Sequence, residues 1–269
     1  MASTLKGNSG REYIKNAILR QYPKAPEFNI HRASCGGSLF VVKRVSESFF
    51  HLSKELEEEF RESKRLRIYI DCNKAEHTLI YDHYKNTLLG LLEKYPNFPP
   101  IEIKKILRYT GNAIKELYEK DWIYIVALGD FNLALKLVDQ QPLRAPQAVG
   151  NAIWRSPEGQ SGKGIAKPSD IFSFGLVCIY SLGGGPILIL DNEIIQGLKD
   201  NGMPDVLYKS ASEITDAEAV DDPDARFERW SRDIAPHLDS DAKKMILQMV
   251  NLDPLKRATI QEILHSSWW

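Results

Sequence analysis

The chain has 269 residues, of which 43% are hydrophobic and 26% are charged, and its formal net charge is −1 at pH 7. These ordinary globular values exclude a disordered or fibrous class, and the near-zero charge gives no basis for a nucleic-acid or membrane partner. The length suits one large domain or two packed lobes.

The first part of the chain is rich in strand signals. Residues 28–46 hold two short apolar runs separated by CGGS, which predicts a strand, a glycine turn and a second strand. Residues 48–67 repeat apolar side chains near helical spacing with charges on the other face, which predicts an amphipathic helix. Two more strands are expected at 68–71 and 77–84, on either side of the turn CNKAE.

The remainder of the chain is mainly helical in pattern. A short helix is expected at 87–95, where NFPP ends it, and a long one at 101–122. Two further helical stretches lie at 235–250 and 259–267. We therefore expect an α+β protein with a small β-rich lobe followed by a larger helical lobe. The expected division is an N-terminal extension at 1–27, a first lobe at 28–84 and a second lobe at 85–269.

One uncharged stretch has the length of a membrane span. Residues 171–190 contain twenty residues without a charge, about the number a spanning helix needs. The GGGP inside it predicts a helix that stops at Leu182. A helix that is apolar on every side is then expected at the buried centre of the larger lobe.

The cysteines and the N-terminus bear on the compartment. Cys35, Cys72 and Cys178 are odd in number and far apart, which argues against a disulfide framework or a zinc site. The first fifteen residues have no apolar stretch, so we expect no secretory signal and a mature chain that starts here. An intracellular location, cytoplasmic or nuclear, is the expectation.

Four residues stand in a definite order along the chain: Lys43 in FVVK, Glu59 in the predicted helix, Asp130 in LGDFNLA and Glu158 at the end of GNAIWRSPE. Each has a plainer explanation alone; Asp130, for example, follows an apolar strand at a Gly-Asp-Phe-Asn turn. Together they resemble the signature set of the eukaryotic protein kinase superfamily: a strand lysine, a helix glutamate, an Asp-Phe-Gly magnesium motif and an Ala-Pro-Glu motif.

The resemblance continues to the end of the chain. SDIFSFG is similar to the family's Asp-x-Trp-x-x-Gly helix start, with Asp170 as its carboxylate. NLDPLKRATIQEILHSSWW is similar to the family's last helical block, in which Arg257 would pair with Glu158. The likeness covers roughly residues 28–269, and it implies a bilobal protein-kinase-like fold and ATP-dependent phosphorylation of protein Ser/Thr.

The resemblance implies roles for three of these residues. Phosphoryl transfer depends on charge stabilisation and positioning, so a lysine for the α and β phosphates of ATP and acidic ligands for Mg²⁺ carry most of the effect. Lys43 would bind the phosphates, Glu59 would orient it and Asp130 would bind Mg²⁺. Glu58 or Glu62 remains an alternative to Glu59, and an isolated VVK would more simply hold a solvated lysine.

The same likeness places the adenine at the strand that leaves the first lobe. Tyr81 would lie at the back of the pocket, and the Asp82 carbonyl and Tyr84 amide would face the purine. Val41 stands against the adenine where the family usually has alanine, which narrows the slot. Because backbone groups make this contact, side-chain identity tests it poorly, and an ordinary strand end remains an alternative.

Several other positions depart from the family pattern. The glycine-rich phosphate loop is reduced to Gly36 and Gly37 in SCGGSLF. Asn132 replaces the glycine of the magnesium motif and permits less backbone rotation there. Asn151 stands in place of a threonine that usually contacts the catalytic aspartate in serine/threonine kinases.

The largest departure is the absence of the catalytic loop HRDLxxxN, whose aspartate acts as base and whose asparagine binds the second metal. Residues 123–129 alone separate Trp122 from Asp130, and they number seven, fewer than the about eight that the motif occupies. No catalytic aspartate can be assigned. Asp170 should also lose a partner, because in the family this carboxylate receives backbone amides of the loop.

Three hypotheses from different classes follow. The chain is an active kinase from whose sequence the loop has been omitted, or a pseudokinase that acts as a binding or scaffold module and still binds nucleotide weakly, or an unrelated α+β protein with chance motifs. The ordered match disfavours the third. For the chain as written we expect no efficient phosphotransfer, and a protein substrate or binding partner.

Overall fold

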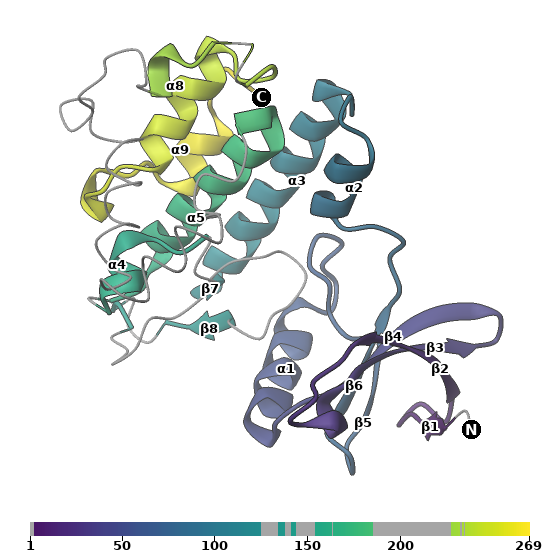
Figure 1. Ribbon diagram of the computed structural model, residues 1–269. Helices are drawn as coiled ribbons and strands as arrows, with labels where there is room; N and C mark the ends of the chain where they lie inside the picture. Colours follow the sequence, from purple (N-terminus) through teal and green to yellow (C-terminus); the bar gives the residue numbers. More distant parts are fainter. Residues whose placement is uncertain are drawn as a thin grey trace. The chain divides into compact units, whose positions relative to one another are not determined.

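The computed structural model describes residues 3–124, 134–137, 141–143, 154–162, 164–184, 227–231, 233 and 235–269. The chain divides into two compact units, Met1–Gly90 and Leu91–Trp269. The first unit is built on a sheet and the second is mainly helical, which confirms the α+β class expected from the sequence (Figure 1).

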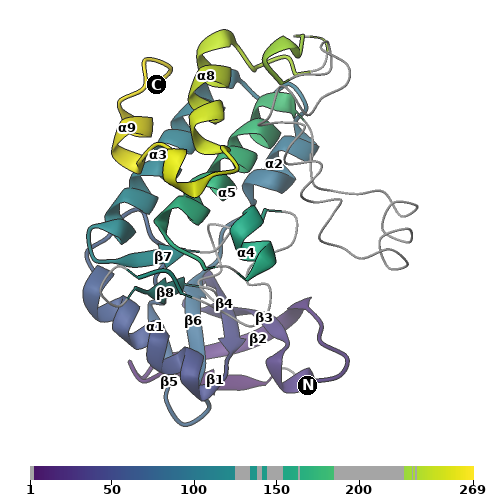
Figure 2. The ribbon, with the colours of Figure 1, turned by 90° about the vertical axis from the view of Figure 1, so that its left-hand side faces the viewer.

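The first unit contains a six-stranded antiparallel sheet with the strand order β1-β2-β3-β4-β6-β5 (Figure 2). The strands are β1 (Thr4–Lys6), β2 (Glu12–Arg20), β3 (Ile30–Cys35), β4 (Ser38–Arg44), β5 (Asp71–Asn73) and β6 (Thr78–Asp82). Strands β1 and β2 lie within residues 1–27, where the sequence had indicated no strands. Part of the expected N-terminal extension is therefore paired into the sheet.

The β3–β4 hairpin turns on two glycines, as the CGGS sequence predicted. Cys35 pairs with Ser38, and between them Gly36 and Gly37 have φ angles of 56° and 82°. Two consecutive positive φ angles are those of a type I′ turn, which glycine adopts without steric cost.

The two faces of the sheet bury separate groups of side chains. Neighbouring residues on one strand point to opposite faces, and Leu79 and Ile80 accordingly join different clusters. One cluster contains Leu5, Tyr13, Ala33, Phe40, Val42 and Ile80. The other contains Val45, Phe50, Cys72 and Leu79, to which helix α1 (Glu47–Phe60) contributes Phe50.

Serines lie just before and just after helix α1. The Ser46 hydroxyl accepts from the Phe49 amide at 3.3 Å and caps the first turn. The helix stops at Phe60, seven residues before the expected end at 67. Just beyond, the Ser63 hydroxyl accepts from the Arg65 and Leu66 amides, both at 3.1 Å, and this local turn competes with further helix.

The segment between β1 and β2 bonds to β5, the strand at the other edge of the sheet. The Asn8 amide donates to the Cys72 carbonyl at 2.7 Å, and the Asn73 side-chain amide donates to the Lys6 carbonyl at 2.9 Å. These contacts connect the end of β1 and the turn after it to β5, although β1 and β5 form no ladder.

Asp71 on β5 strengthens this connection. Its carboxylate accepts from the Ser9 hydroxyl, the Tyr13 hydroxyl at 3.0 Å, and the amides of Ser9 and Cys72 at 3.2 and 2.8 Å. Burial by itself would raise the pKa of Asp71, but the Ser9, Cys72 and Tyr13 hydrogen bonds lower it overall. A Cβ on Gly7 would lie 2.0 Å from an Asp71 oxygen, so only glycine fits there.

The second unit is built from helices and one short pair of strands. Helix α2 begins in the first unit and ends in the second. The elements are α2 (Leu88–Lys94), α3 (Pro100–Tyr118), β7 (Trp122–Tyr124), β8 (Ala134–Lys136), α4 (Pro157–Ser161), α5 (Lys167–Ile179), α8 (Ser240–Met249) and α9 (Ile260–Leu264).

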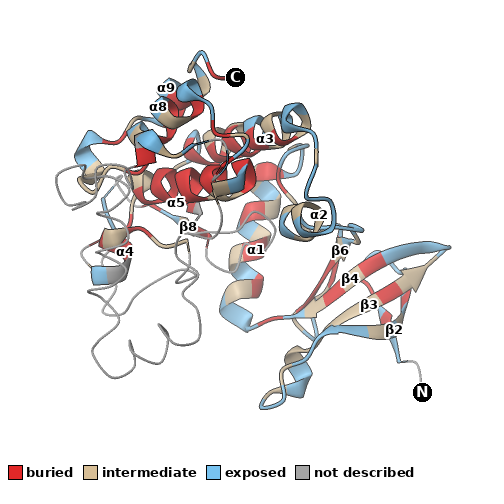
Figure 3. Cartoon of the chain, turned by 45° about the horizontal axis from the view of Figure 1, so that its top comes forward, coloured by how far each residue is buried: buried red, intermediate tan, exposed pale blue. Residues whose placement is uncertain are grey.

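Helix α5 forms the centre of the second unit and is buried along most of its length (Figure 3). Glycines allow the helices to approach closely: a Cβ on Gly175 would lie 2.5 Å from Val250, and one on Gly111 would lie 2.9 Å from Leu264. After α5 the chain leaves the helical path at Gly183, whose φ is 92°. Among the helices of the described residues, none has the length and apolarity to cross a membrane.

Candidate functional site

Lys43 lies on β4 opposite Leu79 of β6, on the face of the sheet that packs against α1. Its ammonium is 5.7 Å from the centre of the Phe49 ring in the first turn of α1. The lysine is partly buried. In the structure, the candidate phosphate-binding lysine thus lies on a central strand, beside the helix that carries the acidic run.

The acidic residues within 57–62, at the end of α1 and just after it, differ in their exposure to solvent. Glu58 and Glu62, the two alternatives to Glu59, are exposed, whereas Glu59 is partly buried. Glu57 is bound by Arg61, whose Nε and Nη2 donate to its carboxylate oxygens at 2.6 and 3.0 Å. The burial of Glu59 supports the preference for it over the other two residues.

The strand expected to meet adenine is contacted at its end by a residue that the sequence did not indicate, Arg67, which lies between α1 and β5. Val41 pairs with Tyr81 as part of the β4–β6 ladder. The Asp82 carbonyl, however, accepts a 2.6 Å hydrogen bond from Arg67 Nη2. The Arg67 guanidinium also lies 5.3 Å from the Tyr81 ring centre and 5.1 Å from that of Tyr84. A cation therefore occupies the expected purine-facing carbonyl.

The two glycines expected as a remnant of the phosphate loop have a different use. Gly36 and Gly37 form the tight turn between the paired strands β3 and β4, so there is no wide loop at this point to wrap phosphates. The longer connection at 21–29, between β2 and β3, contains no glycine.

The end of α3 leads almost directly into a strand. Residues 119–121 alone join α3 to β7, and Asp121 turns the chain with a φ of 58°. Its carboxylate pairs with Lys167 at 2.7 Å, and its carbonyl accepts from the Leu137 amide at 2.8 Å. Strand β7 then pairs antiparallel with β8. Neither histidine nor asparagine occurs between the end of α3 and the end of β7.

Three expected positions lie outside the described residues: Asp130, the candidate magnesium ligand, Asn132 and Asn151. Within the described ranges, no group of three or more His, Cys, Asp or Glu side chains could hold a metal ion. The magnesium role of Asp130 stays a prediction.

Asp170 lies buried in the first turn of α5. The Tyr118 hydroxyl at the end of α3 donates to the Lys167 carbonyl at 2.6 Å and lies 3.4 Å from Asp170 Oδ2. Burial, and then the negative charge of Asp170, raise the pKa of Tyr118. Tyr118 therefore stays protonated, with its hydroxyl beside the carboxylate that the family's loop would otherwise contact.

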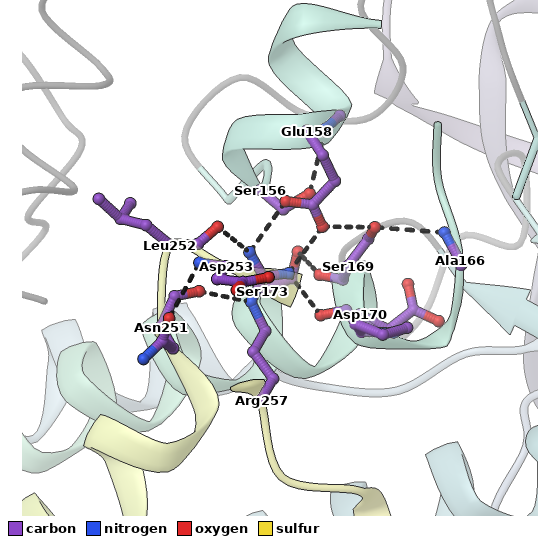
Figure 4. Close-up of polar contacts among 12 residues, drawn as sticks. Ser156, Glu158, Ala166, Ser169, Asp170, Ser173, Asn251, Leu252, Asp253 and Arg257 are labelled. Carbon is purple, nitrogen blue, oxygen red and sulfur yellow. Dashed lines mark hydrogen bonds and ion pairs between the residues drawn. The ribbon is translucent and has the colours of Figure 1, made fainter. Parts of the chain in front are cut away.

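Glu158 and Arg257 form a buried bidentate ion pair, as the likeness to the family had implied (Figure 4). Arg257 Nη1 and Nη2 donate to Glu158 Oε1 and Oε2 at 2.6 and 2.9 Å, and the Ser169 hydroxyl donates to Oε1 at 2.7 Å. Burial would raise the pKa of Glu158, but the hydrogen bonds and charge of Arg257 hold it below its ordinary value.

Carbonyl groups satisfy the remaining donors of Arg257. Its Nε donates to the Asn251 carbonyl at 2.7 Å, and its Nη1 donates to the Pro168 carbonyl at 2.9 Å. The guanidinium also lies 4.9 Å from the centre of the Phe172 ring. One side chain thus links α4, the start of α5 and the segment before α9.

The family model for the protein kinase domain matches residues 55–269. The match includes Glu59, Asp130, Glu158 and Arg257, and it begins after Lys43. A search of curated proteins found no match to this chain. The matched region spans well over half of the sequence, and the chain therefore belongs to the protein kinase domain family.

Proposed function

We propose that this chain, as written, does not transfer phosphate efficiently and acts as a kinase-fold binding module for a protein partner. The observation that carries the proposal is the short stretch between the end of α3 at Tyr118 and Asp130: residues 119–121 lead into β7, only seven residues separate Trp122 from Asp130, and residues 119–129 contain neither histidine nor asparagine. In a kinase of this family, the catalytic loop lies between its long helix and the magnesium motif.

The chemistry explains why this absence is severe. When bound, Mg²⁺ and ATP supply the phosphoryl group and neutralise its charge. The protein's part is to align the acceptor hydroxyl with a loop aspartate and to hold one metal with a loop asparagine. Lys43 and Glu59 could contribute charge to the phosphates, but neither can align an acceptor.

Two features of the expected adenine edge oppose tight binding of adenine. Arg67 already donates to the Asp82 carbonyl, and no glycine loop follows the short β3–β4 turn. Both observations support weak nucleotide binding through Val41, Lys43 and Tyr84 rather than the tight binding that catalytic turnover requires.

The framework for a binding module is nevertheless present. The Glu158–Arg257 pair, with its carbonyl contacts, organises α4, α5 and the last helices without the catalytic loop. Membership of the family implies protein substrates or partners. We propose that this chain binds a protein partner even though it does not transfer phosphate. A soluble intracellular chain is part of the same proposal.

The first test is a phosphotransfer assay on the purified full chain with Mg²⁺, labelled ATP and a panel of Ser/Thr-containing protein substrates. We expect incorporation no greater than that of an Asp130→Ala variant prepared in parallel. Transfer that is clear in the parent chain and disappears in Asp130→Ala would overturn the proposal.

A second reading is that the loop is omitted from this sequence and present in the intact protein. The joint favours it, because residues on both sides match the family pattern. The genomic DNA between codons 123 and 126 decides between the two. An in-frame stretch encoding His-x-Asp and a downstream Asn selects the omission and restores protein Ser/Thr phosphorylation as the function; uninterrupted coding sequence selects the pseudokinase.

A further inference from the structure

Arg67 lies between two tyrosines at the end of β6. Its guanidinium carbon is 5.3 Å from the Tyr81 ring centre and 5.1 Å from that of Tyr84, and its Nη2 is 2.6 Å from the Asp82 carbonyl oxygen. We call these four residues the Arg67 cluster. All of them belong to the first compact unit.

The contacts fix both the position and the direction of the guanidinium. A distance of 2.6 Å is short for a hydrogen bond between a charged nitrogen donor and a carbonyl oxygen. Cation–π attraction to the Tyr81 and Tyr84 rings restricts the side chain further. In the part of the chain that the structure describes, no carboxylate pairs with Arg67, and its buried Nε has no hydrogen-bond partner.

This arrangement replaces a hydrogen-bond acceptor at the end of β6 with hydrogen-bond donors. A carbonyl oxygen accepts hydrogen bonds, whereas a guanidinium has five N–H donors and no acceptor. With Arg67 in place, a base that approaches the Asp82 carbonyl meets donors. The exocyclic group of a 6-aminopurine such as adenine is itself a donor, so the two conflict. A 6-oxopurine presents two acceptors, O6 and N7, on one edge, and that edge matches an arginine.

We propose that Arg67 is a specificity-determining residue that closes the Asp82 carbonyl to 6-aminopurine nucleotides and favours 6-oxopurine nucleotides. The inference rests on the proposed function, because it takes Asp82 and Tyr84 as the purine-facing edge. It concerns binding alone and requires no phosphotransfer. The obstacle to binding of an adenine nucleotide is thus a single side chain, which can be replaced by mutation.

The test compares ADP with inosine diphosphate, which differ only in the base: adenine carries an amino group at position 6 and an unprotonated N1, whereas hypoxanthine carries an oxo group at position 6 and a proton on N1. The dissociation constant of each is measured by calorimetry on the full chain. The parent protein should bind inosine diphosphate more tightly. Arg67→Met, which keeps a long apolar stem against the tyrosines but has no donor, should tighten ADP about two- to tenfold, the range expected for one hydrogen bond. Inosine diphosphate should gain nothing.

Two further variants sharpen the comparison. Arg44→Ala removes an exposed arginine next to Lys43 and should leave the ratio of the two dissociation constants unchanged. Arg67→Lys keeps a charged donor without the planar fork and should retain part of the discrimination. Circular dichroism melting of every variant establishes that the fold is intact before titration.

Three results would overturn the proposal: an unchanged ratio in Arg67→Met, equal tightening of both nucleotides, or no binding of either by a folded Arg67→Met. The first two show that the hydrogen-bond polarity of Arg67 does not select the base. The third shows that the freed carbonyl is not a purine edge. Phosphotransfer in the separate assay would refute the proposed function and leave this ratio unaffected.

Discussion

Arg257 makes more polar contacts than its ion pair alone requires. Besides the two bonds to Glu158, it donates to the carbonyls of Asn251 and Pro168, and its side chain is fully buried. Removal of one partner from a buried pair leaves an uncompensated charge. We expect Arg257→Ala to lower the free energy of unfolding by about 3–5 kcal/mol, measured by urea denaturation of the full chain.

Lys256→Ala is the matched control for this variant. Lys256 is adjacent and exposed, so its loss should change stability by no more than about 0.5 kcal/mol. Arg257→Lys should fall between the two, because an ammonium cannot make the bidentate contact. Equal midpoints for Arg257→Ala and Lys256→Ala would show that the pair contributes little.

Sequence reasoning reaches some of these residues and not others. Glu158 and Arg257 are 99 positions apart, yet each lies in a short motif whose pairing the family resemblance implies. Arg67 belongs to no motif. Its contact with Asp82 depends on where the chain turns after α1, and that turn depends on local bonds to Ser63. A contact set by loop geometry leaves no periodic signal in the sequence.

At the scale of elements, Asp71 ties the β1–β2 hairpin to β5. Its carboxylate serves two hydroxyls and two amides, and the residue is 6% exposed. Asp71→Ala leaves these donors without their acceptor, and the Tyr13 side chain among them is buried whereas Ser9 is exposed. We expect a loss of about 1–3 kcal/mol and faster hydrogen exchange at the amides of Ser9 and Cys72.

Exposed Glu12 at the start of β2 provides the comparison. Glu12→Ala should leave exchange at both amides as it is in the parent chain. If Asp71→Ala exchanged no faster than Glu12→Ala, the hydrogen bonds to Asp71 would not be what holds the hairpin.

Strand β2 also shows why element prediction failed near the N-terminus. Its apolar residues Tyr13, Ile14, Ala17 and Ile18 are spaced as on a helix, not in strict alternation. The ladder with β3 contains two register shifts, between Lys15 and Ala17 and between Ile18 and Arg20, which break the two-residue period. The central hairpin at 30–44 was predictable, because regular pairing and the Gly-Gly turn agree.

At the scale of the whole molecule, each compact unit has its own core and its own buried carboxylate. Asp71 lies in Met1–Gly90 and Glu158 in Leu91–Trp269. Mutations at sites without shared partners usually add within about 0.3–0.5 kcal/mol. We expect Asp71→Ala and Arg257→Ala to be additive to that limit, measured by a double-mutant cycle in urea. A coupling above about 1 kcal/mol would contradict this independence.

The family could be predicted from sequence because its motifs are residue types at fixed positions, and the family match from residue 55 onward confirms the family. The connection between the β1–β2 segment and β5 could not. It depends on hydrogen bonds between segments some 60 residues apart, such as Asn8 with Cys72, and backbone groups leave no mark on residue identity.

The pairing of the N-terminal strands with the sheet has a practical consequence for shortened versions of this protein. Open strand edges present unpaired amides and carbonyls that recruit other chains and promote aggregation. A fragment that began at residue 28, where the first lobe was expected to start, would lack β1 and β2, uncover the edge of β3 and free the Cys72 carbonyl of β5. The first two dozen residues therefore serve as protection against self-association, and expression should begin before β1.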